Sequence, residues 1–423
     1  MKKHTVAIIG GGLGGLCLAN GLKKAGIRVT VYERDQSPES RPQGYRIHID
    51  PHGSTALHQC LPSHLWDLFA STGGDFSQGF SIVTQQLQEL LNLARIGAPG
   101  SIARHRSISR ITLRRILLAG LEGDVKFDKR FLRYEEAPDG AIIAHFEDGS
   151  TAQADLLVAA DGLNSPVRKQ YLPHTEPIDT GVVAIGGTLR LTDGVMALAP
   201  HFLLDGPVMV VPPSACSMFL AMWKRSGEAA QPLRSLGIEG PLSGDEDYLL
   251  LALSGRPDFF GLDQPSGSIN GTALKDILRR TTAGWHPNLR KLVAMVDEEQ
   301  LFLNHIRTSQ PPVPWKSTHV TLLGDAIHSM TPYRGVGGNI ALKDAALLTS
   351  QLTQADQGQK SWLDAISEYE GSMREYAFAA VEDSLKAMKQ YTGRKKYPAF
   401  SLFKTGMRVA NAVPKLKRKL MPA

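Results

Sequence analysis

The chain has 423 residues, of which 42% are hydrophobic and 21% are charged, a composition typical of a soluble globular protein. This length is more than one simple core needs, so we expect two closely packed domains. No run of about 18 apolar residues occurs, which predicts no transmembrane helix. Glycines at positions 10–12 interrupt the N-terminal stretch that superficially resembles a signal peptide.

Charge is distributed unevenly along the chain. The formal net charge is +6, yet nine Lys and Arg residues and no Asp or Glu lie between Tyr391 and Ala423. The remainder therefore carries about −3, so the basic character belongs to the tail and the sequence predicts no nucleic-acid-binding body. Three widely spaced cysteines, Cys17, Cys60 and Cys216, form neither a disulfide framework nor a metal site, which predicts a reducing cytoplasm.

The predicted elements begin with a βαβ unit. Residues 5–9 form a β-branched run that ends in glycines, residues 14–25 have the apolar spacing of a helix, and residues 28–32 form a second strand. Farther along, residues 109–121 predict a helix rich in leucine and arginine.

The middle of the chain predicts mostly strands. Residues 141–146 and 151–160 read as two strands, and the region 180–305 consists of strand-like runs broken by proline and glycine, which predicts an inserted sheet with few helices. A buried strand at 320–323 and a helical stretch from 338 to about 390 follow. We therefore predict an α/β fold in which a Rossmann-like domain is interleaved with a mostly β domain and ends in a helical C-terminal third.

The turn after the first strand has the spacing Gly10-x-Gly12-x-x-Gly15 of a dinucleotide-binding loop. Its glycines allow a tight turn, approach of the pyrophosphate and close helix packing, while the helix N-terminus offers free N–H groups. Glu33 ends the second strand, where a carboxylate can accept hydrogen bonds from ribose hydroxyls and would repel the 2′-phosphate of NADP. The motif alone does not choose FAD over NAD. The residues expected to bind the dinucleotide here are Gly10, Gly12, Leu13, Gly14, Gly15, Glu33 and Arg34.

Two further motifs follow predicted strands, at the strand ends where α/β sheets bind ligands. Residues 160–168 read Ala-Asp-Gly-Leu-Asn-Ser-Pro-Val-Arg, and residues 323–328 read Leu-Gly-Asp-Ala-Ile-His. Asp325 could hold the hydroxyls of a ribityl chain. The loop at 334–338 enters a helix, whose N-terminus suits a developing anion such as reduced flavin. Singly, each motif could instead be a β-turn with an Asx cap.

In this order, the three motifs resemble the signature of the group A flavoprotein monooxygenases, the p-hydroxybenzoate hydroxylase superfamily. The resemblance spans roughly residues 5–385, and Arg110 looks like the FAD-contacting arginine of the family's Arg-x-x-Leu helix. The positions that match the second and third motifs are Asp161, Gly162, Ser165, Arg168, Gly324, Asp325, His328, Pro332, Gly335, Gly337 and Asn339.

The resemblance implies an FAD cofactor in a glutathione-reductase-like domain, with NADPH or NADH as co-substrate and O2 as oxidant. In the family, a C4a-hydroperoxyflavin hydroxylates or epoxidises the substrate, here expected to be a small, largely apolar aromatic, polyene or prenylated compound. The alternatives are a flavin-dependent halogenase or reductase on the same scaffold, or a non-catalytic flavin-binding protein. No catalytic acid or base is assigned. The cofactor residues expected beyond the first motif are Arg110, Asp161, Gly162, Gly324, Asp325, Gly335, Gly337, Gly338 and Asn339, together with Arg46 from its position on a strand face.

The chain departs from the family at three places. Residues 44–47 read Gly-Tyr-Arg-Ile where many relatives have Gly-Ala-Gly-Ile beside the flavin, and Arg334 stands where a glutamine is common. Residues 184–187 lack the catalytic arginine of salicylate-type members, so salicylate-like substrates are not expected. Arg46 and His48 share one strand face, so Arg46 could contact FAD or substrate; a solvated strand face is the alternative.

We expect the FAD-binding domain to comprise residues 1–175 and 311–390, the substrate-binding sheet residues 176–310, and a basic tail residues 391–423. The tail's nine cations are interleaved with Phe400, Leu402, Phe403, Met407 and Val409. This pattern predicts either a helix that lies on an anionic membrane or a basic segment that wraps the body or stays disordered. The protein is otherwise expected to be cytoplasmic, with possible peripheral membrane contact.

Overall fold

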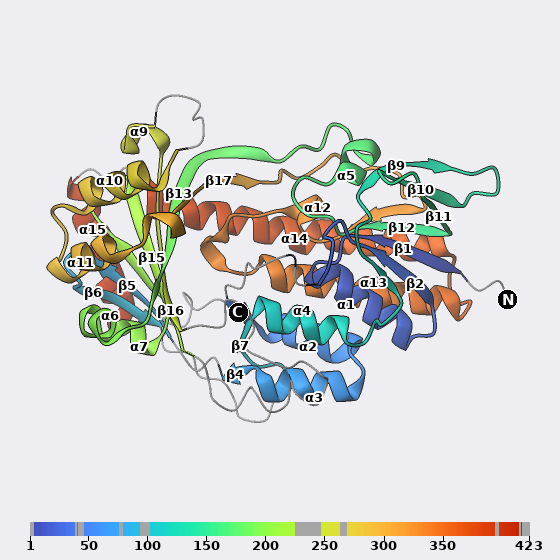
Figure 1. The fold of residues 1–423 in the computed structure, drawn as a ribbon, viewed down its shortest axis with the longest axis horizontal. Coiled ribbons are helices and arrows are strands. Elements are labelled where there is room, and N and C mark those ends of the chain that lie inside the picture. Colours follow the sequence, from blue (N-terminus) through green and yellow to red (C-terminus); the bar gives the residue numbers. More distant parts are fainter. Residues whose placement is uncertain are drawn as a thin grey trace.

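The computed structural model describes residues 4–38, 40, 46–75, 79–93, 102–224, 247–262, 269–393, 397–413 and 416. The chain forms two lobes side by side along its long axis, one built on a parallel sheet and the other on a larger sheet (Figure 1). The predicted α/β class is confirmed, including the helical C-terminal third. Gly44 and Tyr45, and most of the last residues of the basic tail, lie outside the described residues.

The first lobe is built on a five-stranded parallel sheet. Its strands are, in order, β18 (Val320–Leu322), β12 (Leu156–Ala159), β1 (Thr5–Ile9), β2 (Arg28–Tyr32) and β8 (Val125–Lys126). A strand from the last third of the chain thus completes a sheet begun by its first residues. The predicted βαβ unit is confirmed, with α1 (Leu13–Lys24) between β1 and β2.

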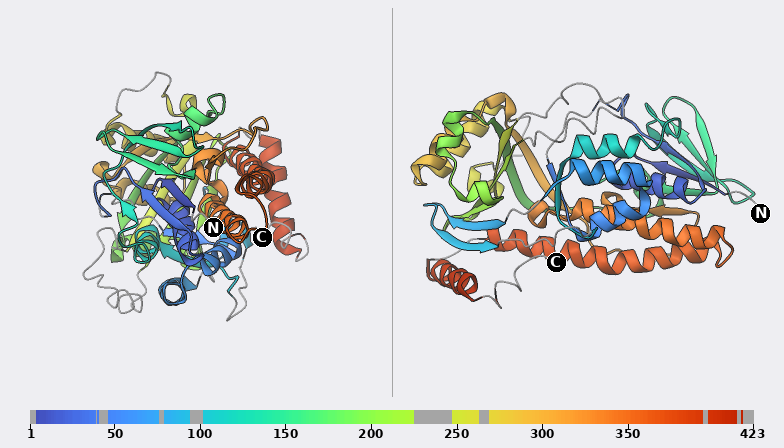
Figure 2. Two further views of the ribbon diagram at one scale, coloured as in Figure 1. Left: turned by 90° about the vertical axis from the view of Figure 1, so that its right-hand side faces the viewer. Right: turned by 90° about the horizontal axis from the view of Figure 1, so that it is seen from below.

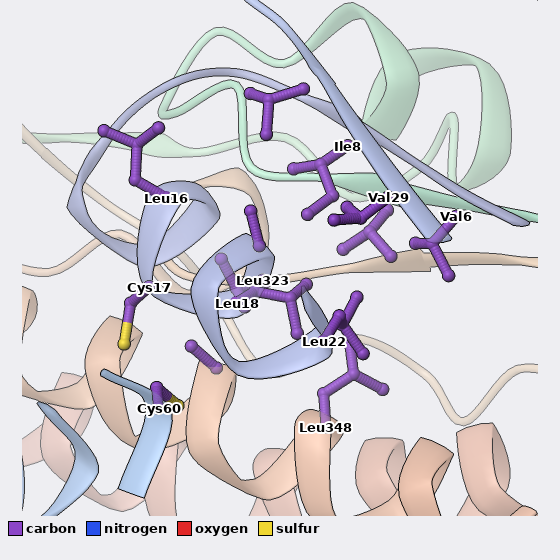
Figure 3. Packing of buried hydrophobic residues seen from close by; sticks show 14 of the residues in the cluster. Val6, Ile8, Leu16, Cys17, Leu18, Leu22, Val29, Cys60, Leu323 and Leu348 are labelled. Carbon is purple, nitrogen blue, oxygen red and sulfur yellow. The ribbon is translucent and has the colours of Figure 1, made fainter. Parts of the chain in front are cut away.

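Helix α1 lies in a close-packed layer beside this sheet. Its side chains, such as Leu18 and Leu22, are fully buried and lie next to those of β1 and α13 (Gly337–Asp356) (Figure 3). Gly21 permits the contact with α13, because a Cβ atom there would lie 2.4 Å from Oγ1 of Thr349. This packing holds the N-terminus of α1 firmly against the end of β1.

Further elements complete the first lobe. They are α2 (Pro51–Cys60), α3 (Ser63–Thr72), α4 (Arg110–Leu118) and a small antiparallel sheet of β3 (Arg46–Ile49), β7 (Arg106–Ser109) and β4 (Gly74–Asp75). Two of them, α2 and α4, contact α1 directly. Helix α4 confirms the helix predicted within residues 109–121.

The prediction of a single strand at 151–160 is wrong, because this segment forms two strands. β11 (Thr151–Ala154) belongs to an antiparallel sheet, while β12 turns into the parallel sheet. At the break, the carboxylate of Asp155 accepts hydrogen bonds from the backbone N–H and the hydroxyl of Thr5, at 2.8 and 2.9 Å. The other members of the antiparallel sheet are β10 (Ile142–Phe146) and β9 (Phe131–Glu136).

The second lobe contains a seven-stranded sheet. Its strands are, in order, β17 (Phe302–Thr308), β13 (Ile178–Arg190), β16 (Tyr248–Gly255), β15 (Cys216–Trp223), β14 (Val208–Val211), β5 (Phe80–Thr84) and β6 (Glu89–Leu93). β5 and β6 precede residue 176, so the sheet also uses a part of the chain that we assigned to the first FAD-binding segment. The domain boundaries themselves stay a prediction.

The expectation of few helices between 180 and 305 is wrong. One face of the sheet is covered by helices, namely α6 (Asp193–Leu198), α7 (Phe202–Asp205), α9 (Pro257–Phe260), α10 (Gly271–Thr282) and α11 (Pro287–Met295). Helix α10 buries Leu274, Ile277 and Leu278, the three- and four-residue spacing of an amphipathic helix. Asn270 caps α10, which begins at Gly271, and α11 begins at Pro287, so a glycine and a proline that we expected to interrupt strands are instead the first residues of helices.

Two long helices and the tail complete the structure. α13 and α14 (Trp362–Thr392) confirm the predicted helical stretch, and α14 runs alongside both lobes (Figures 1 and 2). α15 (Tyr397–Ala412) lies against β6 of the second lobe (Figure 2). No helix in the described ranges has the length and apolar content needed to cross a bilayer.

The apolar residues of the tail are divided between the sheet and solvent. Phe400, Phe403 and Met407 pack in a cluster with strands β5, β6 and β14, and Phe400 is only 6% exposed. Leu402 and Val409 point outward, with exposures of 74% and 49%. Within α15, therefore, the structure agrees with a tail that wraps the body and offers no support for membrane contact.

Candidate functional site

A cavity of about 1350 Å³ lies between the two lobes. Its walls are the C-terminal ends of β1, β12 and β18, the N-termini of α1 and α13, and the inner face of the seven-stranded sheet. The residues predicted at the cofactor that line this cavity are Gly10, Gly12, Leu13, Gly14, Gly15, Glu33, Arg34, Arg46, Arg110, Asp161, Gly162, Gly324, Asp325, Gly335, Gly337 and Gly338. The tertiary fold thus brings nearly all of the predicted site together.

The glycine loop packs so closely against neighbouring backbone that side chains at Gly10 and Gly15 would collide with it. Gly10 has φ +108°, and a Cβ atom there would lie 2.4 Å from the carbonyl oxygen of Ala160. A Cβ atom on Gly15 would lie 2.3 Å from the carbonyl oxygen of Gly10. Gly12, the residue before α1, provides no side-chain cap, and the first turn of the helix contains no acidic residue. Uncapped N–H groups therefore face the cavity, as the pyrophosphate of a dinucleotide requires.

Glu33 closes the loop from the side of β2. Its buried carboxylate accepts hydrogen bonds from the backbone N–H groups of Gly11 (2.7 Å) and Asp35 (3.0 Å). The guanidinium of Arg114 lies 4.0 Å from this carboxylate, and its Nε donates to the carbonyl oxygen of Gly11 (3.2 Å). Arg110, one turn earlier on α4, extends to the cavity. Sequence reasoning did not assign Arg114 to the site, although it belongs to the same helix motif.

Asp161 is a partly exposed acid at the cavity wall whose carboxylate group is buried. Both of its carboxylate oxygens are buried without a close hydrogen-bond partner among the described residues. Burial raises the pKa of Asp161 to about 6, although Ser165 and the positive charge of Arg168 oppose the shift. Arg168 is itself buried, and its guanidinium donates to the carbonyl oxygen of Ala326 at 2.8 Å. Arg168 therefore links the second motif physically to the third.

The raised pKa of Asp161 predicts a pH-dependent stability of the FAD-free protein. Unfolding returns this pKa to about 4, so the native state holds the proton more tightly, and stability decreases as the pH rises from about 4 to 6. The effect is at most about 3 kcal/mol. We expect Asp161→Asn to remove this component from urea unfolding curves recorded between pH 4.5 and 7. An unchanged difference between the two proteins across that range would contradict the assignment.

The third motif presents Asp325 to the cavity. Asp325 begins the short helix α12 (Asp325–His328) and is exposed to the cavity. α13 begins at Gly337 without a side-chain cap and without an acid in its first turn, so its N–H groups also face the cavity. A Cβ atom on Gly338 would lie 2.5 Å from Cδ1 of Ile47, which brings this helix end against β3.

Asn339 occupies a different place from the one we expected. Its side chain is fully buried behind the cavity wall, where its amide group donates to the carbonyl oxygen of His48 (2.9 Å). Its carbonyl oxygen accepts the backbone N–H of Asp50 (3.0 Å). Asn339 therefore joins α13 to the backbone around β3, and the structure gives it a supporting position rather than a place at the cavity surface.

Helix α14 anchors the loop that precedes α13. Arg334, the departure from the family's glutamine, forms an ion pair with Asp383 at 2.5 Å. The hydroxyl of Thr331 donates to the carbonyl oxygen of Ser384 at 2.8 Å. His328 is a fully buried histidine that forms a hydrogen bond with Asp344 at 2.6 Å. The roles of Asp344 and Asp383 could not be predicted from the residues next to them, because their partners belong to other elements.

Arg46 connects the two lobes at the cavity. Its guanidinium donates to the hydroxyl of Ser107 at 2.7 Å and also to the carbonyl oxygen of Ser107. It lies over the ring of Trp223, 5.4 Å from the centroid, and its backbone N–H donates to the hydroxyl of Tyr248 (3.0 Å). His48, on the same strand, also lines the cavity. Arg46 thus lies at the edge of the cavity where β3 of the first lobe meets the seven-stranded sheet.

The sheet side of the cavity is mostly apolar. The residues that line it are Leu203, Leu204, Pro207, Phe219, Ala221, Met222, Trp223, Lys224, Tyr248 and Leu250. Among the described residues, no group of three His, Cys, Asp or Glu side chains is arranged to hold a metal ion. The geometry therefore offers a dinucleotide site on one side and an apolar chamber on the other.

Comparisons with known proteins support the FAD site. The family described as "FAD binding domain" matches residues 3–189 and 297–384. The chain is 30% identical to the FAD-dependent urate hydroxylase of Klebsiella oxytoca, over 81% of this chain and 79% of that protein. A crystal structure described as an FAD-containing monooxygenase of Photorhabdus luminescens has a TM-score of 0.81 and 37% identity, and covers 92% of this chain and 98% of its own.

A longer relative also matches. The chain is 30% identical to the dual O-methyltransferase/FAD-dependent monooxygenase elcB of Phaeosphaeria nodorum, over 93% of this chain but 46% of that protein. The chain therefore spans about half the length of the dual-function relatives that it matches.

Proposed function

Because this chain belongs to the FAD-dependent monooxygenases of group A, we propose that it uses NADPH or NADH and O2 to oxygenate a small, largely apolar organic substrate. One atom of O2 would enter the substrate as a hydroxyl or epoxide, the other would leave as water, and the nicotinamide would supply two electrons. The observation that carries the proposal is the continuous cavity that joins the glycine loop, the Asp325 turn and the apolar face of the sheet.

Different residues of the cavity would bind different parts of FAD. The uncapped N-terminus of α1 would bind the pyrophosphate, Glu33 the ribose and Asp325 the ribityl hydroxyls of FAD. Bound FAD would supply the activation of O2. The N-terminus of α13, near Gly337, is suited to stabilise negative charge on the flavin. The sheet would orient the substrate and exclude water.

The lining of the sheet side supports an apolar substrate. Phe219, Met222, Trp223 and Leu250 present aromatic, thioether and aliphatic surfaces to the cavity. Such surfaces suit an aromatic, polyene or prenylated compound, while Lys224 could hold a polar substituent. We propose that this chain shares the reaction class of the urate hydroxylase but accepts a more apolar substrate.

We expect the purified, FAD-loaded protein to oxidise NADPH or NADH faster when a substrate is present. A panel of aromatic, polyene and prenylated compounds would be screened under ¹⁸O2, with product mass as the second readout. A product that contains one ¹⁸O atom supports the monooxygenase. Oxidation that no compound accelerates would contradict it and favour a non-catalytic flavin protein, and a product that forms only with added halide would favour the halogenase.

We also propose that the enzyme is located in the cytoplasm. The sequence suggests a cytoplasmic protein, and peripheral membrane contact would have to use the outward residues Leu402 and Val409 with the basic residues of the tail. The inward residues of α15 are not available for this contact, because they pack against the sheet.

A further inference from the structure

A buried carboxylate, that of Asp344, lies behind the turn that presents Asp325 to the cavity. Asp344 is on α13, two turns after Gly337, and its side chain is completely buried. A buried carboxylate is stable only when donors surround it. Its hydrogen-bond partners therefore identify what it holds in place.

Three donors from three elements meet at this carboxylate. Oδ2 of Asp344 accepts the backbone N–H of Gly324 at 2.9 Å and Nε2 of His328 at 2.6 Å. Oδ1 accepts the hydroxyl of Tyr376, on α14, at 2.5 Å. One side chain thus ties α13 to the end of β18, to α12 and to α14.

His328 makes its polar contact with Asp344. Its Nδ1 atom is buried without a hydrogen-bond partner in the described part of the chain. Burial opposes the charged imidazole, but the charge and hydrogen bond of Asp344 outweigh it and raise the pKa of His328. The imidazole therefore connects α12 to the carboxylate of Asp344 through this hydrogen bond.

Other contacts also hold the turn: the backbone N–H of Leu323 donates to the carbonyl oxygen of Ala159 at 2.9 Å, and Ala326 and Ile327 are fully buried. Gly324 has φ +63°, and a Cβ atom there would lie 3.0 Å from Cβ of Ala341, so the backbone passes close to α13. Arg168 also holds α12, because its guanidinium donates to the carbonyl oxygen of Ala326 at 2.8 Å. The direction in which Asp325 points therefore depends on how the backbone on either side of it is held.

We propose that Asp344 is a positioning residue for the FAD site, which sets the orientation of Asp325 by holding the Gly324 amide and His328. The inference rests on the proposed contact between Asp325 and the ribityl chain. It predicts that loss of Asp344 weakens FAD binding through Asp325 and not through general loss of stability.

The test measures the dissociation constant of FAD by quenching of flavin fluorescence. Asp344→Leu keeps the approximate size of the side chain and removes every acceptor. We expect the constant to rise by about 10- to 100-fold, as the loss of hydrogen bonds to a charged group implies. In an Asp325→Ala background the same substitution should change the constant by less than about 3-fold, because the side chain it orients is absent.

Glu370→Met is the matched control. Glu370 is also a buried carboxylate, on α14, and accepts hydrogen bonds from Ser317 (2.6 Å) and Thr321 (2.8 Å) without lining the cavity. Its replacement should lower the melting temperature while leaving the FAD constant within about 2-fold of the parent value.

Tyr376→Phe provides a second variant if Asp344→Leu does not fold. It removes one donor and keeps the ring beneath the ammonium group of Lys343, which lies 3.7 Å from the ring centroid. A rise of about 2- to 10-fold is expected, again only when Asp325 is present. Unchanged FAD affinity, an additive effect in the Asp325→Ala background, or an equal effect of Glu370→Met would overturn the inference. A parent protein that binds no FAD would instead overturn the proposed function.

Discussion

Gly10→Ala should lower the affinity for FAD by at least about 100-fold, because the new methyl group meets the backbone of the neighbouring strand. The Cβ atom would lie 2.4 Å from the carbonyl oxygen of Ala160 and 2.8 Å from Cα of Asp161. Backbone atoms at the ends of two paired strands cannot move apart without disturbing β1 and β12. Left-handed backbone strain at φ +108° adds about 1–2 kcal/mol. Titration with FAD, followed by flavin fluorescence, measures the loss.

Gly26→Ala separates strain from contact. Gly26 also has a positive φ, +82°, but nothing lies within 4 Å of its Cβ position. We expect this variant to lose about 1 kcal/mol of stability and to bind FAD as the parent does. Equal FAD affinities for Gly10→Ala and Gly26→Ala would show that the close approach to Ala160 does not shape the site.

Removal of α15, by ending the chain at Gly393, should destabilise the second lobe by about 4–8 kcal/mol, because the sheet loses its apolar cover. Phe400, Phe403 and Met407 would no longer bury the residues of β5, β6 and β14 beneath them. Phe219 belongs to the same cluster and also lines the cavity, so the apolar side of the cavity should be disturbed as well. Denaturant unfolding and the binding of the hydrophobic dye ANS measure the effect.

Two point variants on the same helix provide the control. Phe400→Ala should cost about 3–5 kcal/mol, because its side chain is 6% exposed, whereas Leu402→Ala, at 74% exposure, should cost less than about 0.5 kcal/mol. Equal stabilities would mean that α15 does not pack as the structure shows. Co-sedimentation with anionic vesicles at low salt adds a second readout. Binding that is lost in Leu402→Ala but kept in Phe400→Ala would support the membrane proposal.

Local chemistry made part of the site predictable. Gly10, Gly12 and Gly15 stand at fixed spacings between a strand and a helix, and each spacing reflects a backbone requirement that residues next to one another satisfy. Asp161 and Asp325 follow buried strands, and the edge of a parallel sheet brings such strand ends together. These features needed no knowledge of the distant parts of the chain.

Contacts between segments far apart in the sequence could not be predicted in this way. β5 and β6 join the second sheet although they precede residue 176, and the sheet's covering helices resembled broken strands in the sequence. Asn339 lies behind the cavity wall, because its side chain bonds to the backbone at His48 and Asp50. These hydrogen-bond partners are hundreds of residues apart, so no pattern of neighbouring residues predicts them.

By itself, the sequence determined the fold class, the FAD-binding motifs and the family, because strand periodicity, glycine spacing and strand-end acids act over a few residues. Only the tertiary structure decided which of these residues face the cavity, that α15 packs on the sheet, and that Asp344 joins Gly324, His328 and Tyr376. Each of those outcomes depends on hydrogen bonds and burial between segments that meet only after the chain has folded.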